Sequence, residues 1–132
     1  MRHTLFAAVA AASLLVAGAA SAQMVHYTAK LAGTGKGSGD VMGMLEGKTF
    51  TYTANYKDLS GPAVAAHFHD AATPGGDGPP IVPTMNAGTS PIKGTATLTD
   101  AQIADLNAGK VYFNIHTAAN PKGEIRGTLT KQ

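Results

Sequence analysis

Apolar and polar residues alternate along much of this chain, and a period of two predicts β-strands. In residues 25–31 one face carries Val25, Tyr27, Ala29 and Leu31. Residues 49–56 repeat the pattern, with aromatic residues on one face and threonines on the other. Because successive side chains of a strand point to opposite faces, both segments are expected to be half-buried strands.

Shorter segments with a similar pattern predict further strands at 41–45, 93–98 and 124–130. Residues 33–40 contain a glycine at every second position and are expected to form a loop. Residues 71–91 are rich in proline and glycine, with Ile81 and Val82 as their one apolar pair. Since proline donates no backbone hydrogen bond, any strand in this stretch must lie at a sheet edge.

One helix is predicted at residues 99–108. Thr99 stands at the N-cap and Gln102 follows three residues later, which is the spacing of a capping box. Leu98 and Ile103 occupy the positions of a hydrophobic staple, and a glycine after the segment suits the C-terminal cap. About six to eight short strands with one short helix indicate an all-β fold, an antiparallel β-sandwich or barrel.

The first residues predict a secretory signal peptide, residues 1–22. Arg2 precedes an apolar run from Leu5 to about Ala20, and Ala20-Ser21-Ala22 offers a small-x-small cleavage site. A retained anchor helix is the alternative. Cleavage after Ala22 would leave one domain, residues 23–132, with no membrane span, in a secreted or periplasmic location.

The amino-acid composition of the chain excludes several classes of function. The chain has no cysteine, so neither disulfides nor thiol chemistry are available. Its formal net charge is +2, and the charged residues are spread singly without a basic block. We therefore expect no nucleic-acid binding.

Two histidine-bearing segments, residues 65–70 and 112–117, carry the candidate chemistry. In the first segment, alternation places His67 and His69 on one face, away from Val64, Ala66 and Phe68. In the second, Tyr112, Asn114 and His116 share the face opposite Val111, Phe113 and Ile115. If the two strands are neighbours in register, three imidazoles converge on one polar surface.

Such a cluster has two interpretations. His67, His69 and His116 form a set of imidazoles suited to copper or zinc, with an open coordination position. Alternatively, these histidines only stabilise the fold, through hydrogen bonds to loop backbone, to Asp70 or to Glu124. Residues that would support a metal site from outside are Asn114, Glu124 and Arg126.

Other soft or imidazole ligands are less well placed in the sequence. His26 is a candidate fourth ligand, although an exposed histidine is the simpler interpretation. Thioether ligands for Cu(I) are offered by Met24, Met42, Met44 and Met85. They form no Met-x-x-Met series, and core filling is the commoner role of methionine. Met42 and Met44 nevertheless share a strand face.

Two stretches carry a resemblance to a known family. One is Leu59-Ser60-Gly61-Pro62 leading to Ala66-His67-Phe68-His69, and the other, above all, is residues 112–127, Tyr-Phe-Asn-Ile-His-Thr-Ala-Ala-Asn-Pro-Lys-Gly-Glu-Ile-Arg-Gly. The resemblance is to the CHRD domain, a family named from chordin. It covers most of residues 25–130 and implies an extracellular or periplasmic all-β domain without an agreed activity. Members often carry Glu-x-Pro after the first strand, where this chain has its glycine-rich residues 33–39.

These observations lead to competing functional hypotheses. The first is a non-enzymatic secreted or periplasmic protein that binds one copper or zinc ion. The second is a protein- or surface-interaction module with structural histidines, and a protein partner or homodimer is compatible with either. No nucleophile motif or acid/base carboxylate pair is recognisable, so a metal-dependent redox activity is the only enzyme class left open.

Overall fold

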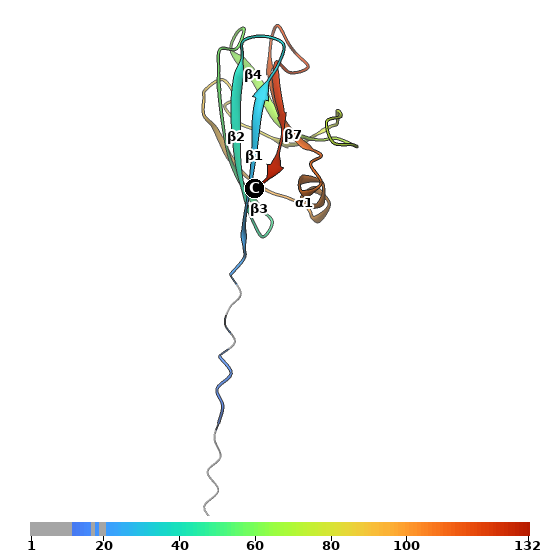
Figure 1. Cartoon of the computed structure of the whole chain (residues 1–132). Helices are drawn as coiled ribbons and strands as arrows, with labels where there is room; N and C mark the ends of the chain where they lie inside the picture. Colours follow the sequence, from blue (N-terminus) through green and yellow to red (C-terminus); the bar gives the residue numbers. More distant parts are fainter. Residues whose placement is uncertain (1–11, 17, 19–20) are drawn as a thin grey trace, which may run out of the picture.

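The described residues form nine β-strands and one α-helix (Figure 1). The computed structural model describes residues 12–16, 18 and 21–132. The strands are β1 (Met24–Ala32), β2 (Ser38–Glu46), β3 (Thr49–Lys57), β4 (Ala63–Asp70), β5 (Pro80–Pro83), β6 (Ile92–Thr97), β7 (Val111–Thr117), β8 (Ile125–Thr128) and β9 (Thr130–Lys131). The predicted signal peptide, residues 1–22, lies mostly outside the described residues, and its cleavage stays a prediction.

All of the strands belong to one antiparallel sheet with the order β5-β4-β7-β8-β1-β2-β3-β6, and β9 also pairs with β1. The predicted all-β antiparallel fold is therefore confirmed. The proline-flanked β5 pairs only with β4, at the edge of the sheet, as the lack of proline donors requires.

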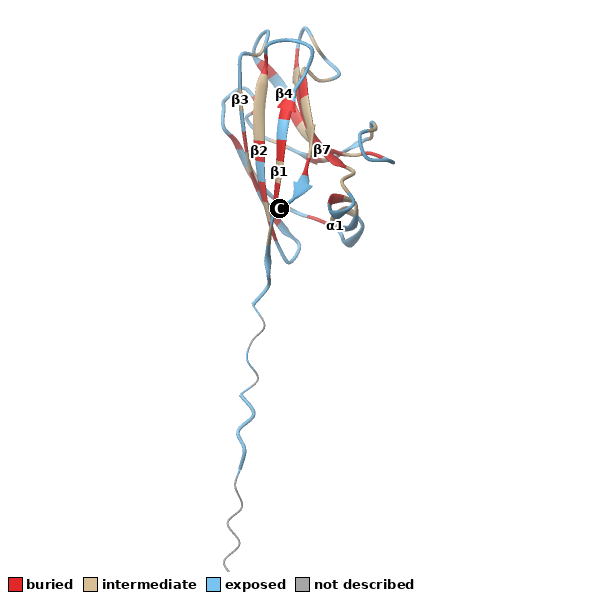
Figure 2. Cartoon of the chain, viewed as in Figure 1, coloured by how far each residue is buried: buried red, intermediate tan, exposed pale blue. Residues whose placement is uncertain are grey.

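Contacts between inner faces show that this sheet curls into a nearly closed barrel. Phe68 on β4 and Phe50 on β3 lie near opposite ends of the strand order, yet their ring centroids are 5.4 Å apart. Tyr52 on β3 also lies 4.8 Å from Phe68, edge to face. Buried residues alternate with more exposed ones along β1, β2 and β3, as the colours of Figure 2 show. The buried side chains are mostly apolar and form the core of the barrel.

The single helix, α1 (Asp100–Asn107), begins as its sequence predicts. The Thr99 hydroxyl accepts a hydrogen bond from the Gln102 N–H at 3.2 Å, and the Gln102 side chain accepts one from the Thr99 N–H at 3.0 Å. Leu106 is buried against the barrel, and the Tyr27 hydroxyl donates to Asn107 at 2.6 Å. Within the described residues, no helix is long and apolar enough to cross a membrane.

Two predicted strands differ from the observed ones by more than a residue at one end or by a break. β2 begins at Ser38 rather than at residue 41, because Ser38–Asp40 continue the pairing with both β1 and β3. The expected strand 124–130 is divided at Leu129. Leu129 itself donates its N–H to the Val111 carbonyl oxygen of β7 at 2.9 Å, and its side chain is fully buried; the pairing of β9 with β1 begins at Thr130.

Val64 was predicted to share the apolar face of β4 with Ala66 and Phe68, and this prediction was wrong. A β-bulge between Ala63 and Ala65 places two residues of β4 opposite one of β7, and the Val64 side chain is 63% exposed. The bulge inserts one unpaired residue, so alternation restarts after it. Ala66 and Phe68 are buried as expected.

Candidate functional site

The pairing of β4 with β7 brings His67, His69 and His116 together on the outer face of the barrel, as the alternation predicts. His67 lies opposite Asn114, and Ala65 lies opposite His116, so His67 and His116 are diagonal neighbours. We call these three residues the histidine cluster. His69 is buried, while the other two are half-buried.

The spacing of the three imidazoles is close to that of metal ligands. One ring nitrogen from each residue lies within 4.8 Å of the other two. His67 Nδ1 and His116 Nε2 are hydrogen-bonded at 3.3 Å. Two nitrogens bound tetrahedrally at ~2.0–2.1 Å from zinc are separated by about 3.4 Å. The His67–His116 pair therefore already has the separation of two ligands on one zinc ion, and His69 supplies the third nitrogen within 4.8 Å of both.

Backbone carbonyls orient two of the rings. His69 Nδ1 lies 2.8 Å from the Gly78 carbonyl oxygen, and His116 Nδ1 lies 2.9 Å from that of Pro121. A carbonyl only accepts hydrogen bonds, so each Nδ1 carries the proton and each neutral ring keeps its lone pair on Nε2. A hydrogen bond of this kind orients a histidine for metal binding.

His69 Nε2 is buried and has no hydrogen-bond partner among the described residues. A buried polar atom without a partner costs free energy, because it has given up its bond to water. This nitrogen carries the lone pair and belongs to the histidine cluster. Binding a cation there would supply the missing partner.

The electrostatics of the cluster favour an uncharged His67 ring. Burial lowers the pKa of His67 below its ordinary value, and positive charge on His116 or His69 would lower it further. Neutral imidazole is the form that binds a metal. His67 is therefore in the ligand form at neutral pH.

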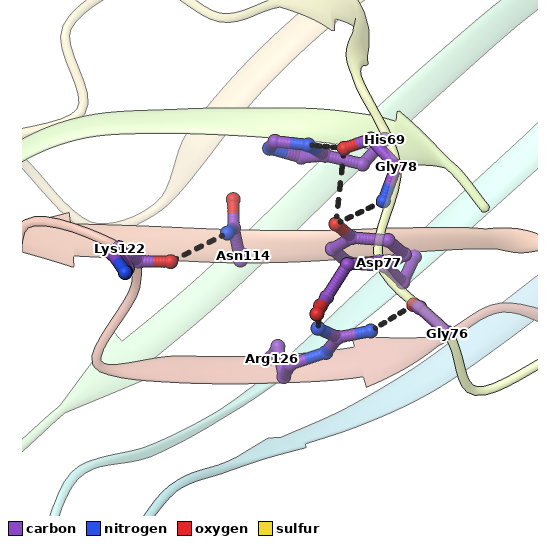
Figure 3. Close-up of polar contacts among 8 residues, drawn as sticks. His69, Gly76, Asp77, Gly78, Asn114, Lys122 and Arg126 are labelled. Atoms are coloured by element: carbon purple, nitrogen blue, oxygen red, sulfur yellow. Dashed lines mark hydrogen bonds and ion pairs between the residues drawn. The ribbon is translucent and has the colours of Figure 1, made fainter.

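A second layer of residues holds His69 in place (Figure 3). The Tyr112 ring stacks on His69, with the centroids 4.9 Å apart and the planes at 12°. The Tyr112 hydroxyl accepts a hydrogen bond from the Gly78 N–H at 3.1 Å. His69 and Tyr112 thus both bind the loop that precedes β5.

Arg126, on the neighbouring strand β8, also binds the loop that precedes β5. Its guanidinium lies 3.8 Å from the centre of the Tyr112 ring. It pairs with Asp77 and donates to the Gly76 carbonyl oxygen at 2.7 Å (Figure 3). Arg126 therefore supports the cluster indirectly, through Tyr112 and the loop around His69.

Asn114 and Glu124 occupy different positions around the cluster. Asn114 is buried opposite His67, and its Oδ1 has no hydrogen-bond partner among the described residues. Glu124 binds Ser60, the Thr117 hydroxyl at 3.0 Å and the Asn120 amide at 2.9 Å. Hydrogen bonds from Ser60 hold the pKa of Glu124 below its ordinary value.

Glu124 therefore stabilises the turn that supplies the Pro121 carbonyl to His116. No hydrogen bond from Glu124 or Arg126 to His116 is present in the described part of the chain. Direct support of His116 by these two residues stays a prediction.

Three residues that support His69 were not predicted from the sequence: Tyr112, Gly78 and Asp77. The role of Tyr112 could have been predicted, because it shares a strand face with Asn114 and His116. Gly78 and Asp77 lie in an irregular loop, where no periodicity predicts their position. His26 is exposed on β1 and does not belong to the histidine cluster.

A comparison with protein families agrees with this architecture. The family model described as CHRD domain matches residues 15–129 of the chain. Searches of curated proteins and of solved structures found no match.

Proposed function

The chain belongs to the CHRD domain family, and we propose that it is a secreted or periplasmic, non-enzymatic protein that binds one copper or zinc ion through the histidine cluster. One observation carries the proposal. Nitrogens of His67, His69 and His116 lie within 4.8 Å of one another, and two of the three rings are oriented by backbone carbonyls.

The donor set limits the choice of metal. Three neutral imidazoles suit zinc and copper, whereas magnesium and calcium prefer oxygen ligands. A His₃ set also leaves a coordination position for water or another small ligand. Metal-dependent redox chemistry at that position would be the enzymatic form of the same site.

Structural histidines are the competing explanation, because the hydrogen bonds to Gly78 and Pro121 stabilise loops and His67 is itself hydrogen-bonded to His116. A specific observation favours metal binding: His69 Nε2 is buried without a partner. A purely structural histidine would gain from a hydrogen bond at both nitrogens. The secreted or periplasmic location rests on the sequence of residues 1–22.

The test is calorimetric titration of the purified, chelator-treated protein with Cu(II) and with Zn(II) at neutral pH. We expect tight one-to-one binding of at least one of these ions. The His67→Ala/His69→Ala variant should lose it, because two of three ligands are removed. Asp100→Asn is the matched control, since it changes an exposed potential ligand that lies outside the histidine cluster, and it should bind as the parent does.

Circular dichroism of each variant separates loss of a ligand from loss of the fold. Equal weak binding by the parent and the double variant would overturn the proposal. The histidines would then be structural, and an interaction module would become the leading hypothesis.

A further inference from the structure

The outer face of β1 and β2 carries three methionines around one histidine. His26 on β1 lies directly opposite Met44 on β2, and Met42 follows two residues away on the same face. Met24 lies two residues before His26. We call these four residues the methionine patch.

Packing does not explain the position of Met24 and Met42, whereas Met44 is half-buried. Met42 is 61% exposed and Met24 is 51% exposed. Their neighbours on the same face are polar: Thr53 lies opposite Met42, and Thr51 lies opposite Met44. A large apolar side chain left in water contributes little burial energy, so the exposed thioethers of Met24 and Met42 are free to bind a ligand above this polar surface.

From this arrangement we propose that the methionine patch is a second metal site, which binds Cu(I) through Met42, Met44 and His26, with Met24 as an additional sulfur donor. Thioether and imidazole groups together favour the soft Cu(I) ion. No step in this proposal requires a change of oxidation state, because copper binds already reduced.

The register brings the donors within reach of one ion. Directly opposed residues in an antiparallel pair have Cβ atoms about 4.5–5.5 Å apart. Residues two apart on one strand are separated by about 7 Å along it. Methionine has three rotatable side-chain bonds and is adaptable, so two sulfurs and one imidazole nitrogen can converge above the sheet.

This site is separate from the histidine cluster and does not depend on it. Strand β8 lies between β7, which carries His116, and β1, which carries His26. The two sites also differ in chemistry, since one offers only imidazoles and the other mainly sulfur. Failure of one proposal therefore leaves the other intact.

The experiment is anaerobic competition for Cu(I) between the protein and a chromophoric Cu(I) chelator, with ascorbate present. The background is the His67→Ala/His69→Ala/His116→Ala variant, which removes the histidine cluster. We expect this variant to retain one equivalent of Cu(I), and Met42→Leu/Met44→Leu in the same background to lose it. Met85→Leu is the matched control, because Met85 is 78% exposed but lies outside the patch.

A second measurement uses the unsubstituted protein, in case the triple variant does not fold. Methyl-labelled methionine is observed by NMR while Ag(I), a redox-inert substitute for Cu(I), is added. The methyl signals of Met42 and Met44 should shift and that of Met85 should not. The proposal would be overturned if adding Met42→Leu/Met44→Leu to the triple histidine variant left its Cu(I) affinity unchanged. It would also be overturned if the Met85 methyl signal shifted as much as those of Met42 and Met44.

Discussion

Tyr112 lies flat on His69, with the ring planes at 12° and the centroids 4.9 Å apart. The two residues are directly opposed on β7 and β4. Because both also contact Gly78, the stack joins the histidine cluster to the loop before β5. The properties of the cluster therefore depend on residues that would never touch a bound metal.

Replacing Tyr112 with leucine should weaken metal binding without removing a ligand. Loss of the stack frees the His69 ring to rotate, and loss of such outer support typically lowers metal affinity about 10- to 100-fold. Calorimetric titration with Cu(II) measures the change. Tyr112→Phe keeps the stack and should have a smaller effect. Unchanged affinity in Tyr112→Leu would show that His69 needs no such support.

Replacing Arg126 with methionine should release the loop of residues 71–79 while leaving the barrel folded. The ion pair with Asp77 is exposed and is expected to contribute ~0–1 kcal/mol. Hydrogen exchange of the loop amides should accelerate, because the bond to Gly76 and the contact with Tyr112 are also lost. Asp77→Asn removes only the ion pair and should change exchange less. Identical exchange in the parent and Arg126→Met would contradict this role.

Stability of the metal-free protein should fall as the pH drops below the ordinary histidine value. The pKa of His67 in the folded protein lies below 6.5, chiefly because of burial. The unfolded chain therefore binds a proton at a higher pH than the folded chain, and protonation favours unfolding. Urea unfolding at neutral and mildly acidic pH should show this loss, and His67→Gln should reduce it. An equal loss in both proteins would exclude His67 as its source.

Removing the hydroxyl of Thr99 should destabilise the protein by about 1 kcal/mol. That hydroxyl accepts the Gln102 N–H, which otherwise has no partner at the start of α1. Thr99→Ser keeps the acceptor and serves as the control. Chemical denaturation gives the free energy of unfolding for each variant, and equal losses in Thr99→Ala and Thr99→Ser would mean that the cap is not responsible.

Adding a methyl group at Gly127 should destabilise the barrel by about 1–3 kcal/mol or more. A Cβ at this position would collide with the backbone carbonyl of Lys30 on β1, and backbone cannot move as a side chain can. Gly35→Ala is the matched control, because its Cβ would meet no atom within 4 Å. A neutral Gly127→Ala would mean that β8 and β1 separate at little cost.

Local features of this protein were predictable from the sequence. The capping box needs only Thr99 and Gln102, three residues apart, so the start of α1 is decided within one helical turn. The faces of β3 and β7 follow from alternation, which is a property of an extended backbone. The shared outer face of His67 and His69 was predictable for the same reason.

Features that depend on pairing between distant segments were not predictable in this way. Val64 is exposed because β4 forms a bulge against β7, and the sequence around Val64 does not predict that bulge. The convergence of His116 with the other two histidines was conditional on β4 and β7 being neighbours. Only the folded sheet established that they are.

The sequence by itself thus determined which side chains share a face, where the helix begins and that the fold is all-β, because these depend on residues a few positions apart. Tertiary structure decided which faces meet. It placed Tyr112 on His69, Arg126 on the loop before β5, and Met44 opposite His26. Those contacts join residues far apart in the chain, and their register is fixed by closure of the whole barrel around one core.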